Sequence, residues 1–185
     1  MTDDELRDGL REAAYLEGDF VLRSGKRSSY YLDKYRFATR PDLLAALGER
    51  IARLLAEFEP DATRLAAPEL GAVALAAAAS LASGLPFLIV RKAAKEYGTT
   101  KRLEGVHDEG ERVCLVEDVV TSGGALLESV EVLREAGLRV QTAVCVVDRE
   151  EGGADALARH GVRLRPIFGA SELLQEAKTP AKPHG

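Results

Sequence analysis

The residues best suited to chemistry lie together in residues 113–130, which have the sequence VCLVEDVVTSGGALLESV. An apolar run there carries two adjacent acids, Glu117 and Asp118. After two valines the chain continues with small or flexible residues, namely Thr121, Ser122, Gly123, Gly124 and Ala125. Glycines let the backbone turn so that several N–H groups converge, and a helix that begins there adds a favourable dipole. The pattern predicts a strand, a phosphate-binding loop and a helix.

The acidic pair narrows the class of ligand. Two carboxylates beside a phosphate-binding loop would repel the ligand unless another part of it needs hydrogen-bond acceptors. Vicinal ribose hydroxyls meet this need, so the pair predicts a ribose 5-phosphate site. A nucleoside-triphosphate loop would need Gly-Lys-Ser/Thr and a dinucleotide site would need GxGxxG, and the segment has neither. An ordinary strand-to-helix turn capped by Thr121 or Ser122 is the structural alternative.

A basic segment precedes this loop. Residues 92–110 lack clear periodicity, and an irregular segment of this length in a compact domain is usually functional, often as a lid. One acid, Glu96, opposes five cations within twelve residues: Arg91, Lys92, Lys95, Lys101 and Arg102. Each cation within about 4 Å of a diphosphate would contribute on the order of 4 kcal/mol of gross attraction at an effective dielectric of about 20. A solvated basic loop is the alternative.

The remaining sequence predicts the elements that position these segments. Strand-like runs fall at residues 63–67, 86–91, 112–117, 139–147 and 162–168. Helical stretches fall between them at residues 71–83, 124–136 and 154–160. Strands that alternate with helices predict an α/β fold, in which helices flank a central, mostly parallel sheet.

The N-terminal part has its own pattern. Thr2 and Glu5 match a capping box that opens a helix to about Leu16. Residues 20–35 alternate and are rich in tyrosine, which predicts a short hairpin or extended flap. A long amphipathic helix is expected to begin at Pro41 and to end near residue 58. We expect residues 1–177 to form one domain with an N-terminal flap over about residues 1–40, and the polar residues 178–185 to be disordered.

Composition excludes several classes of protein. The net charge of −5 over 185 residues argues against a broad nucleic-acid footprint. No apolar run reaches the ~18–20 residues that a membrane span needs, and the acidic N-terminus is unlike a secretory signal, so we expect a cytoplasmic protein. Cys114 and Cys145 lie in β-branched runs and are expected to be buried thiols. No cysteine or histidine cluster has metal-ligand spacing, so no metal site built from protein side chains is expected.

A family resemblance rests on four segments. Residues 117–125 resemble the phosphoribosyl-diphosphate signature of the type I phosphoribosyltransferases. Three others narrow the match to the orotate phosphoribosyltransferase family: LRSGKRSSYYLD at residues 22–33, RKAAKEYG at residues 91–98, which resembles its catalytic loop, and Asp148-Arg149, which resembles its orotate-side dipeptide. The resemblance covers about residues 15–175. It implies the type I phosphoribosyltransferase fold with a small N-terminal hood, and production of orotidine 5′-monophosphate.

The resemblance also implies the site residues. Lys95 and Asp118 would be catalytic. Orotate would contact Thr121, Arg149 and Arg23. Phosphoribosyl diphosphate would contact both the loop and the basic segment, through Arg91, Lys92, Lys95, Tyr97, Glu117, Asp118, Val119, Val120, Thr121, Ser122, Gly123, Gly124 and Ala125.

The chain departs from the family pattern at several of these positions. Tyr97 stands where many members carry histidine, and Arg23 where the family usually has lysine. A tyrosine hydroxyl still hydrogen-bonds a phosphate oxygen but supplies no titratable positive charge near neutrality. For Arg149 the alternative is a surface arginine paired with Glu150 or Glu151.

The same resemblance implies the partners and the cofactor. Mg²⁺ would sit mainly on diphosphate and ribose oxygens rather than in a protein cage. The protein would be a homodimer whose catalytic loop reaches the neighbouring subunit's site, with orotate and phosphoribosyl diphosphate as substrates. Two other functions stay open: a phosphoribosyltransferase for a purine or other base, and a non-catalytic regulator that senses phosphoribosyl diphosphate.

Overall fold

The computed structural model describes residues 1–21, 27–92 and 102–174. Three of the expected site residues, Arg23, Lys95 and Tyr97, lie outside these ranges. The expected disordered tail, residues 178–185, also lies outside them.

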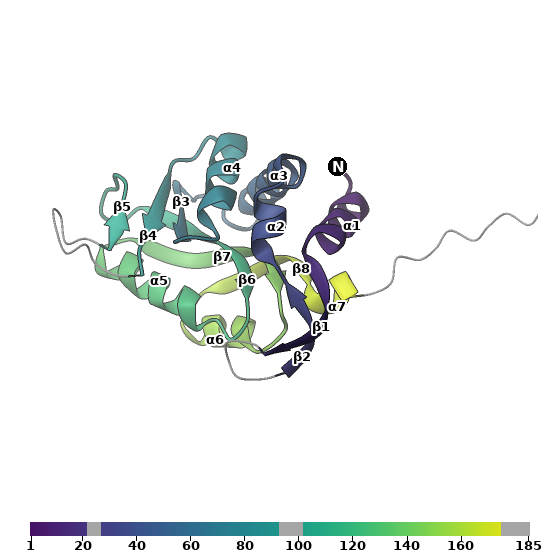
Figure 1. Ribbon diagram of the computed structural model, residues 1–185. Helices are drawn as coiled ribbons and strands as arrows, with labels where there is room; N and C mark the ends of the chain where they lie inside the picture. The colour runs from purple at the N-terminus through teal and green to yellow at the C-terminus, as the bar shows by residue number, and fades with distance from the viewer. Residues whose placement is uncertain (22–26, 93–101, 175–185) are drawn as a thin grey trace, which may run out of the picture.

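A six-stranded sheet forms the centre of the molecule (Figure 1). Its strand order is β5-β4-β3-β6-β7-β8, and all neighbours are parallel except the antiparallel pair β4 and β5. The bounds are β3 Arg64–Pro68, β4 Phe87–Val90, β5 Leu103–Glu104, β6 Arg112–Val120, β7 Arg139–Asp148 and β8 Arg163–Gly169. The predicted α/β fold is confirmed, whereas the short strand β5 was not expected inside the irregular basic segment.

Helices cover both faces of this sheet, as Figure 1 shows. The helices that pack on one face are α1, α3, α4 and α7, and those on the other are α5 and α6. Side chains alternate along each strand, so on β6 Cys114 and Val116 join the first core while Val113 and Leu115 join the second. The bounds are α1 Asp3–Ala14, α2 Lys34–Ala38, α3 Pro41–Phe58, α4 Val73–Ser83, α5 Gly124–Glu135, α6 Gly153–Arg159 and α7 Ala170–Leu174.

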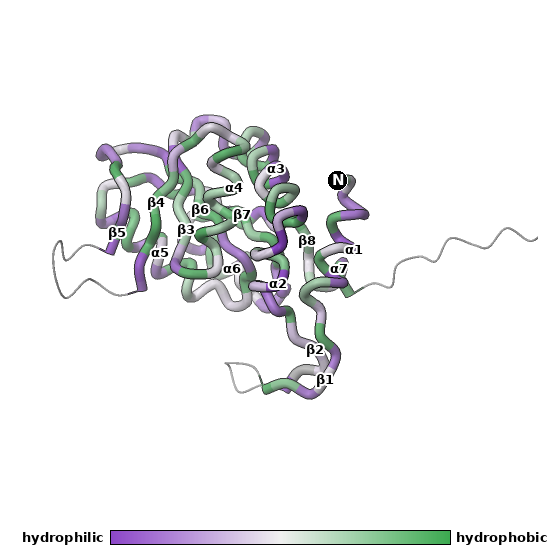
Figure 2. The backbone as a smooth tube through the Cα atoms, turned by 45° about the horizontal axis from the view of Figure 1, so that its top comes forward, coloured by the Kyte–Doolittle hydropathy of each residue, from purple (hydrophilic) through white to green (hydrophobic). Residues whose placement is uncertain are grey.

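The N-terminal segment combines a helix with a hairpin. Thr2 and Glu5 form the predicted capping box at the start of α1. The helix ends at Ala14, two residues before its expected end, because the next residues, Tyr15 and Leu16, pair across a hairpin instead. That hairpin joins β1 (Tyr15–Val21) to β2 (Arg27–Leu32) and projects from the body of the molecule in Figure 2.

Strand β6 extends three residues beyond the expected end at Glu117. The extension occurs because Val119 and Val120 pair in register with Val147 and Asp148 of β7. The acidic pair therefore lies inside a strand, and the turn into α5 begins only at Thr121. Along the described part of the chain, no helix is both long and apolar enough to cross a membrane.

Candidate active site

An open cleft of about 590 Å³ lies where β3, β4 and β6 end. Ligands of open α/β sheets bind at the carboxyl ends of strands, which is this position. The cleft brings together most of the predicted loop and both described ends of the basic segment. The predicted residues that line it are Arg91, Lys92, Arg102, Glu117, Val119, Val120, Thr121, Ser122, Gly123, Gly124 and Ala125.

The predicted phosphate-binding loop leads into a helix with no side-chain cap. Gly123 is the N-cap residue of α5, with a φ of 82°, and among the described residues no side chain caps the first helical N–H groups. Those N–H groups are left for a ligand, and the helix dipole favours an anion there. The alternative of an ordinary turn capped by Thr121 or Ser122 is therefore wrong.

Glycine is needed in this loop because two backbones meet. A Cβ at Gly123 would lie 3.1 Å from the carbonyl oxygen of Gly153 at the start of α6, and a Cβ at Gly153 would lie 2.5 Å from the carbonyl oxygen of Thr121. Val120 also receives a backbone hydrogen bond, from the N–H of Arg149 at 2.8 Å. Contact with the neighbouring strand and helix thus fixes the shape of the loop.

The acidic pair is buried at the side of the cleft. Glu117 lines the cleft, whereas Asp118 is only 1% exposed and lies behind the lining residues. Asp118 accepts hydrogen bonds from the N–H of Val119 at 2.6 Å and from Nζ of Lys34 at 3.1 Å, and its Oδ2 is 2.8 Å from the same Nζ. Its carboxylate is therefore fixed in direction.

Glu117 and Asp118 do not behave as two free, ionised carboxylates. Burial, and then the charge of Asp118, raise the pKa of Glu117 to about 8. Burial alone would lower the pKa of Lys34, but its hydrogen bond with Asp118 and the charge of that carboxylate outweigh burial and raise it. The raised pKa favours the protonated form of Glu117, and the Asp118 carboxylate is paired with a lysine. Such a site repels a phosphate far less than two free carboxylates would.

The described ends of the basic segment face the same cleft. The Arg91 guanidinium lies 3.3 Å from Glu104 and 3.9 Å from Glu69. Lys92 is exposed, and its N–H donates to Glu69 at 2.8 Å. Hydrogen bonding between Arg91 N–H and the Arg102 carbonyl, at 2.8 Å, brings the two ends of the segment together. The cleft thus carries cations on the side that faces the loop of β6 and α5.

Arg149 lies beside the cleft rather than in its lining. Its side chain is 8% exposed, and its Nε is 3.0 Å from Glu151. Its guanidinium lies 5.0 Å from the centre of the Tyr30 ring, which stacks on Tyr15 at 5.8 Å. The alternative predicted for Arg149 was a surface arginine paired with Glu150 or Glu151. Its partner is indeed Glu151, but the side chain is buried against the hairpin and does not lie on the surface. Its role toward orotate stays a prediction.

The comparisons with known proteins agree with this geometry. A family model for the phosphoribosyl transferase domain matches residues 38–159. The orotate phosphoribosyltransferase of Methanocella arvoryzae is 51% identical over 174 residues, which cover 93% of this chain and 97% of that protein. The chain belongs to the orotate phosphoribosyltransferases.

Solved structures support the same family. The orotate phosphoribosyltransferase of Mycobacterium tuberculosis H37Rv, solved with Fe(III) dicitrate, has a TM-score of 0.83 and 31% identity, covering 94% of this chain and 99% of that one. A structure of that protein in complex with 5-phospho-alpha-D-ribosyl 1-diphosphate has a TM-score of 0.78 and 30% identity, covering 92% and 98%. The resemblance drawn from the sequence and the predicted fold are therefore confirmed.

Two parts of this orotate phosphoribosyltransferase site were not among the predicted site residues. Lys34 was missed because it lies in the segment predicted as a flap, where an isolated lysine carries no motif. The loop after β3 resembles a family loop that contacts diphosphate through backbone groups, but it was left out because it lacks the lysine that some members carry there. Its Glu69, Leu70 and Gly71 line the cleft, with a cis peptide bond between the first two. Its position after a parallel strand was the available signal, because such loops share one edge of the sheet with the loop of β6.

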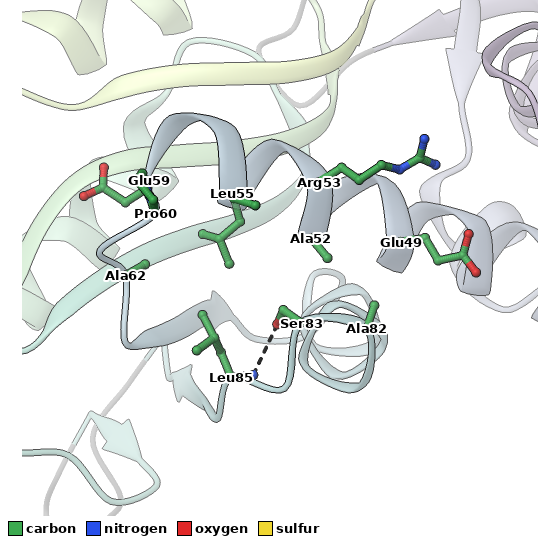
Figure 3. A pocket seen from close by; sticks show the side chains of 11 residues that line it. Glu49, Ala52, Arg53, Leu55, Glu59, Pro60, Ala62, Ala82, Ser83 and Leu85 are labelled. Carbon is green, nitrogen blue, oxygen red and sulfur yellow. Dashed lines mark hydrogen bonds between the residues drawn. The ribbon is translucent and has the colours of Figure 1, made fainter.

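A second cavity of about 590 Å³ lies between α3 and α4 (Figure 3). Alanine and leucine side chains make up much of its lining, and none of the residues predicted for chemistry is among them. Its buried acid, Glu59, accepts a hydrogen bond from Oγ1 of Thr142 at 2.5 Å. The cleft at the strand ends is therefore the candidate active site.

Proposed function

We propose that this chain transfers the 5-phosphoribosyl group from phosphoribosyl diphosphate to orotate, giving orotidine 5′-monophosphate and diphosphate in de novo pyrimidine biosynthesis. The observation that carries the proposal is the meeting, at one cleft, of an uncapped helix start, the acid Glu117 with Asp118 buried beside it, and a set of cations. These groups match the 5-phosphate, the ribose hydroxyls and the diphosphate of one substrate. The choice of orotate as the base is supported by the curated relatives, which are named orotate phosphoribosyltransferase.

The proposed chemistry is a displacement at the anomeric carbon of the ribose. Diphosphate leaves, and a ring nitrogen of orotate attacks from the other face. The N–H groups at the start of α5 would hold the 5-phosphate, while Glu117 and Asp118 would hold the ribose hydroxyls. The charge of Asp118 would also stabilise the developing oxocarbenium ion. The protein thus acts by positioning and electrostatics, with no covalent nucleophile.

The cations and the base-side residues complete the proposed site. Arg91, Lys92 and Lys95 would neutralise the diphosphate, with a hydrogen bond from Tyr97, and Lys95 would be catalytic. Orotate would contact Thr121, Arg149 and Arg23. The bidentate geometry of a guanidinium suits the carboxylate or imide edge of orotate.

Mg²⁺ belongs to the same proposal. Carboxylates that line the cleft include Glu69 and Glu117, yet within the described ranges no three His, Cys, Asp or Glu side chains gather as a metal site. This donor set fits an ion that keeps several waters and is carried mainly by substrate oxygens. When bound, the ion would offset the charge of the departing diphosphate.

The assembly and location are further parts of the proposal. We infer a homodimer in which the segment that contains Lys95 reaches the neighbouring subunit's site. Residues 1–177 would act as one domain, with the N-terminal flap closing on the base. We also propose a cytoplasmic location.

The deciding experiment follows orotate absorbance in the presence of phosphoribosyl diphosphate and Mg²⁺. Turnover is expected with orotate and is expected to be absent with adenine, guanine and hypoxanthine. Turnover of a purine without turnover of orotate would overturn the assignment of the base. Binding of phosphoribosyl diphosphate without turnover of any base would favour a sensor instead.

A further inference from the structure

Lys34 stands between the cleft and Asp118. It is the first residue of α2, directly after the flap hairpin, and it lines the cleft with a side chain that is 37% exposed. Its Nζ lies 2.8 Å from one oxygen of Asp118 and 3.1 Å from the other. Asp118 itself is 1% exposed and does not line the cleft. A ribose hydroxyl that approaches this carboxylate from the cleft therefore meets the ammonium group first.

The backbone around this ion pair leaves room for little else. A Cβ at Gly71 would lie 1.9 Å from Oδ2 of Asp118 and 3.1 Å from Nζ of Lys34. The loop after β3 thus passes close to the carboxylate at Gly71, where there is no room for a side chain. Three segments far apart in the sequence, namely the start of α2, this loop and β6, converge on one charged contact.

The ion pair offsets the free-energy cost of burying the Asp118 carboxylate. A buried carboxylate without a partner is strongly unfavourable, and such a group takes up a proton instead. Asp118 also adjoins a second acid, Glu117, on the same strand. Lys34 supplies the compensating charge while leaving the carboxylate close to the cleft.

We propose that Lys34 is a positioning residue for phosphoribosyl transfer, whose ammonium holds the Asp118 carboxylate in place for the ribose hydroxyls. This inference rests on the proposed function, since it takes phosphoribosyl diphosphate as the ligand. Lys34 acts through Asp118 and therefore on the ribose. Its contribution differs in kind from that of Arg91 and Lys92, which act on the diphosphate.

The test distinguishes an effect on ribose binding from an effect on diphosphate binding. Binding of phosphoribosyl diphosphate, ribose 5-phosphate and inorganic diphosphate is measured by calorimetry with Mg²⁺ present. Lys34→Met is expected to weaken both ribose-containing ligands about tenfold or more, which is the scale of a hydrogen bond to a charged group, and to change diphosphate binding less than about twofold. Lys34→Arg is expected to recover most of the loss. Arg36→Met is the matched control, because Arg36 lies on the same helix, is exposed and pairs only at 3.6 Å with Asp33.

A second variant disturbs the contact from the other side. Gly71→Ala forces a methyl group against Asp118 and should produce the same selective loss while the lysine is retained. Equal weakening of diphosphate in Lys34→Met would show a direct anion contact and overturn the inference, as would unchanged binding of all three ligands. Orotate turnover by the unaltered protein is measured alongside. Its absence would overturn the proposed substrate, whereas the ribose 5-phosphate comparison would still decide the role of Lys34.

Discussion

Gly153 lies against the backbone of Thr121, so closely that a Cβ on Gly153 would be 2.5 Å from the Thr121 carbonyl oxygen and 2.6 Å from a methyl group of Val120. The start of α6 therefore supports the phosphate-binding loop from behind. Because the proposed role of the loop is to present backbone N–H groups to a phosphate, the expected binding depends on this support of the backbone by Gly153.

Gly153→Ala is expected to damage both stability and phosphate binding. Overpacking of this kind typically costs about 1–3 kcal/mol in the free energy of unfolding. Gly124→Ala is the contrast, because a Cβ at Gly124 meets nothing within 4 Å and should leave stability close to the original value. Urea unfolding and calorimetry with phosphoribosyl diphosphate would measure both effects. Equal stability of the two variants would contradict the role given to the loop contact.

Stability should decrease as pH rises through the range set by Glu117. The pKa of this buried acid is raised from 4.5 to about 8, so the folded protein keeps a proton that the unfolded chain releases. This contribution is fully present below the unfolded pKa and is lost as pH rises through the folded one. Glu117→Gln has no such proton, so its stability should fall less over that range. Urea unfolding at several pH values would show it, and parallel curves for the two proteins would contradict it.

Arg149→Lys is expected to impair the use of orotate selectively. Lysine keeps the charge but cannot make two parallel hydrogen bonds to a carboxylate or imide edge. The KM for orotate should rise about tenfold, as expected for loss of a charged hydrogen bond, while the KM for phosphoribosyl diphosphate changes little. Steady-state kinetics with each substrate varied in turn would separate the two. An equal rise in both constants would show that the Arg149 side chain does not act selectively on orotate.

Lys95→Ala is expected to slow turnover on the order of a hundredfold or more, as loss of one electrostatic contact to the transition state does in other enzymes. Its unfolding should match that of the unaltered protein. Mixing this variant with Asp118→Asn should restore part of the activity through hybrid dimers, if the two residues serve one site from different subunits. Complete inactivity of the mixture, with subunit exchange confirmed by mass, would count against a shared site.

Local patterns were enough to predict the architecture and the loop. Alternating strands and helices predicted five of the six strands in the central sheet, and the run from Glu117 to Ala125 predicted the turn into α5. Both are properties of contiguous segments, in which periodicity and glycine content carry the signal. The end of α1 was missed because pairing of Tyr15 with Leu32 across the hairpin overrides the helical pattern.

Contacts between distant segments were not predictable in this way. Lys34 and its partner Asp118 are 84 residues apart, and no local sequence pattern around either residue predicts the contact. The burial of Asp118 was hidden for the same reason, since the loop that covers it follows a different strand. Sequence patterns identified the carboxylate, whereas its environment depends on three segments that meet only in the folded chain.

The pairing of β6 with β7 has a consequence for how such proteins diverge. Val119 and Val120 lie in register with Val147 and Asp148, and the N–H of Arg149 continues the pairing to Val120. The separation between the proposed phosphate loop and the proposed base-side arginine is therefore set by main-chain hydrogen bonds. The apolar side chains of the two strands can therefore be exchanged for other apolar ones without altering this separation, because the spacing suited to a nucleotide is held by the backbone.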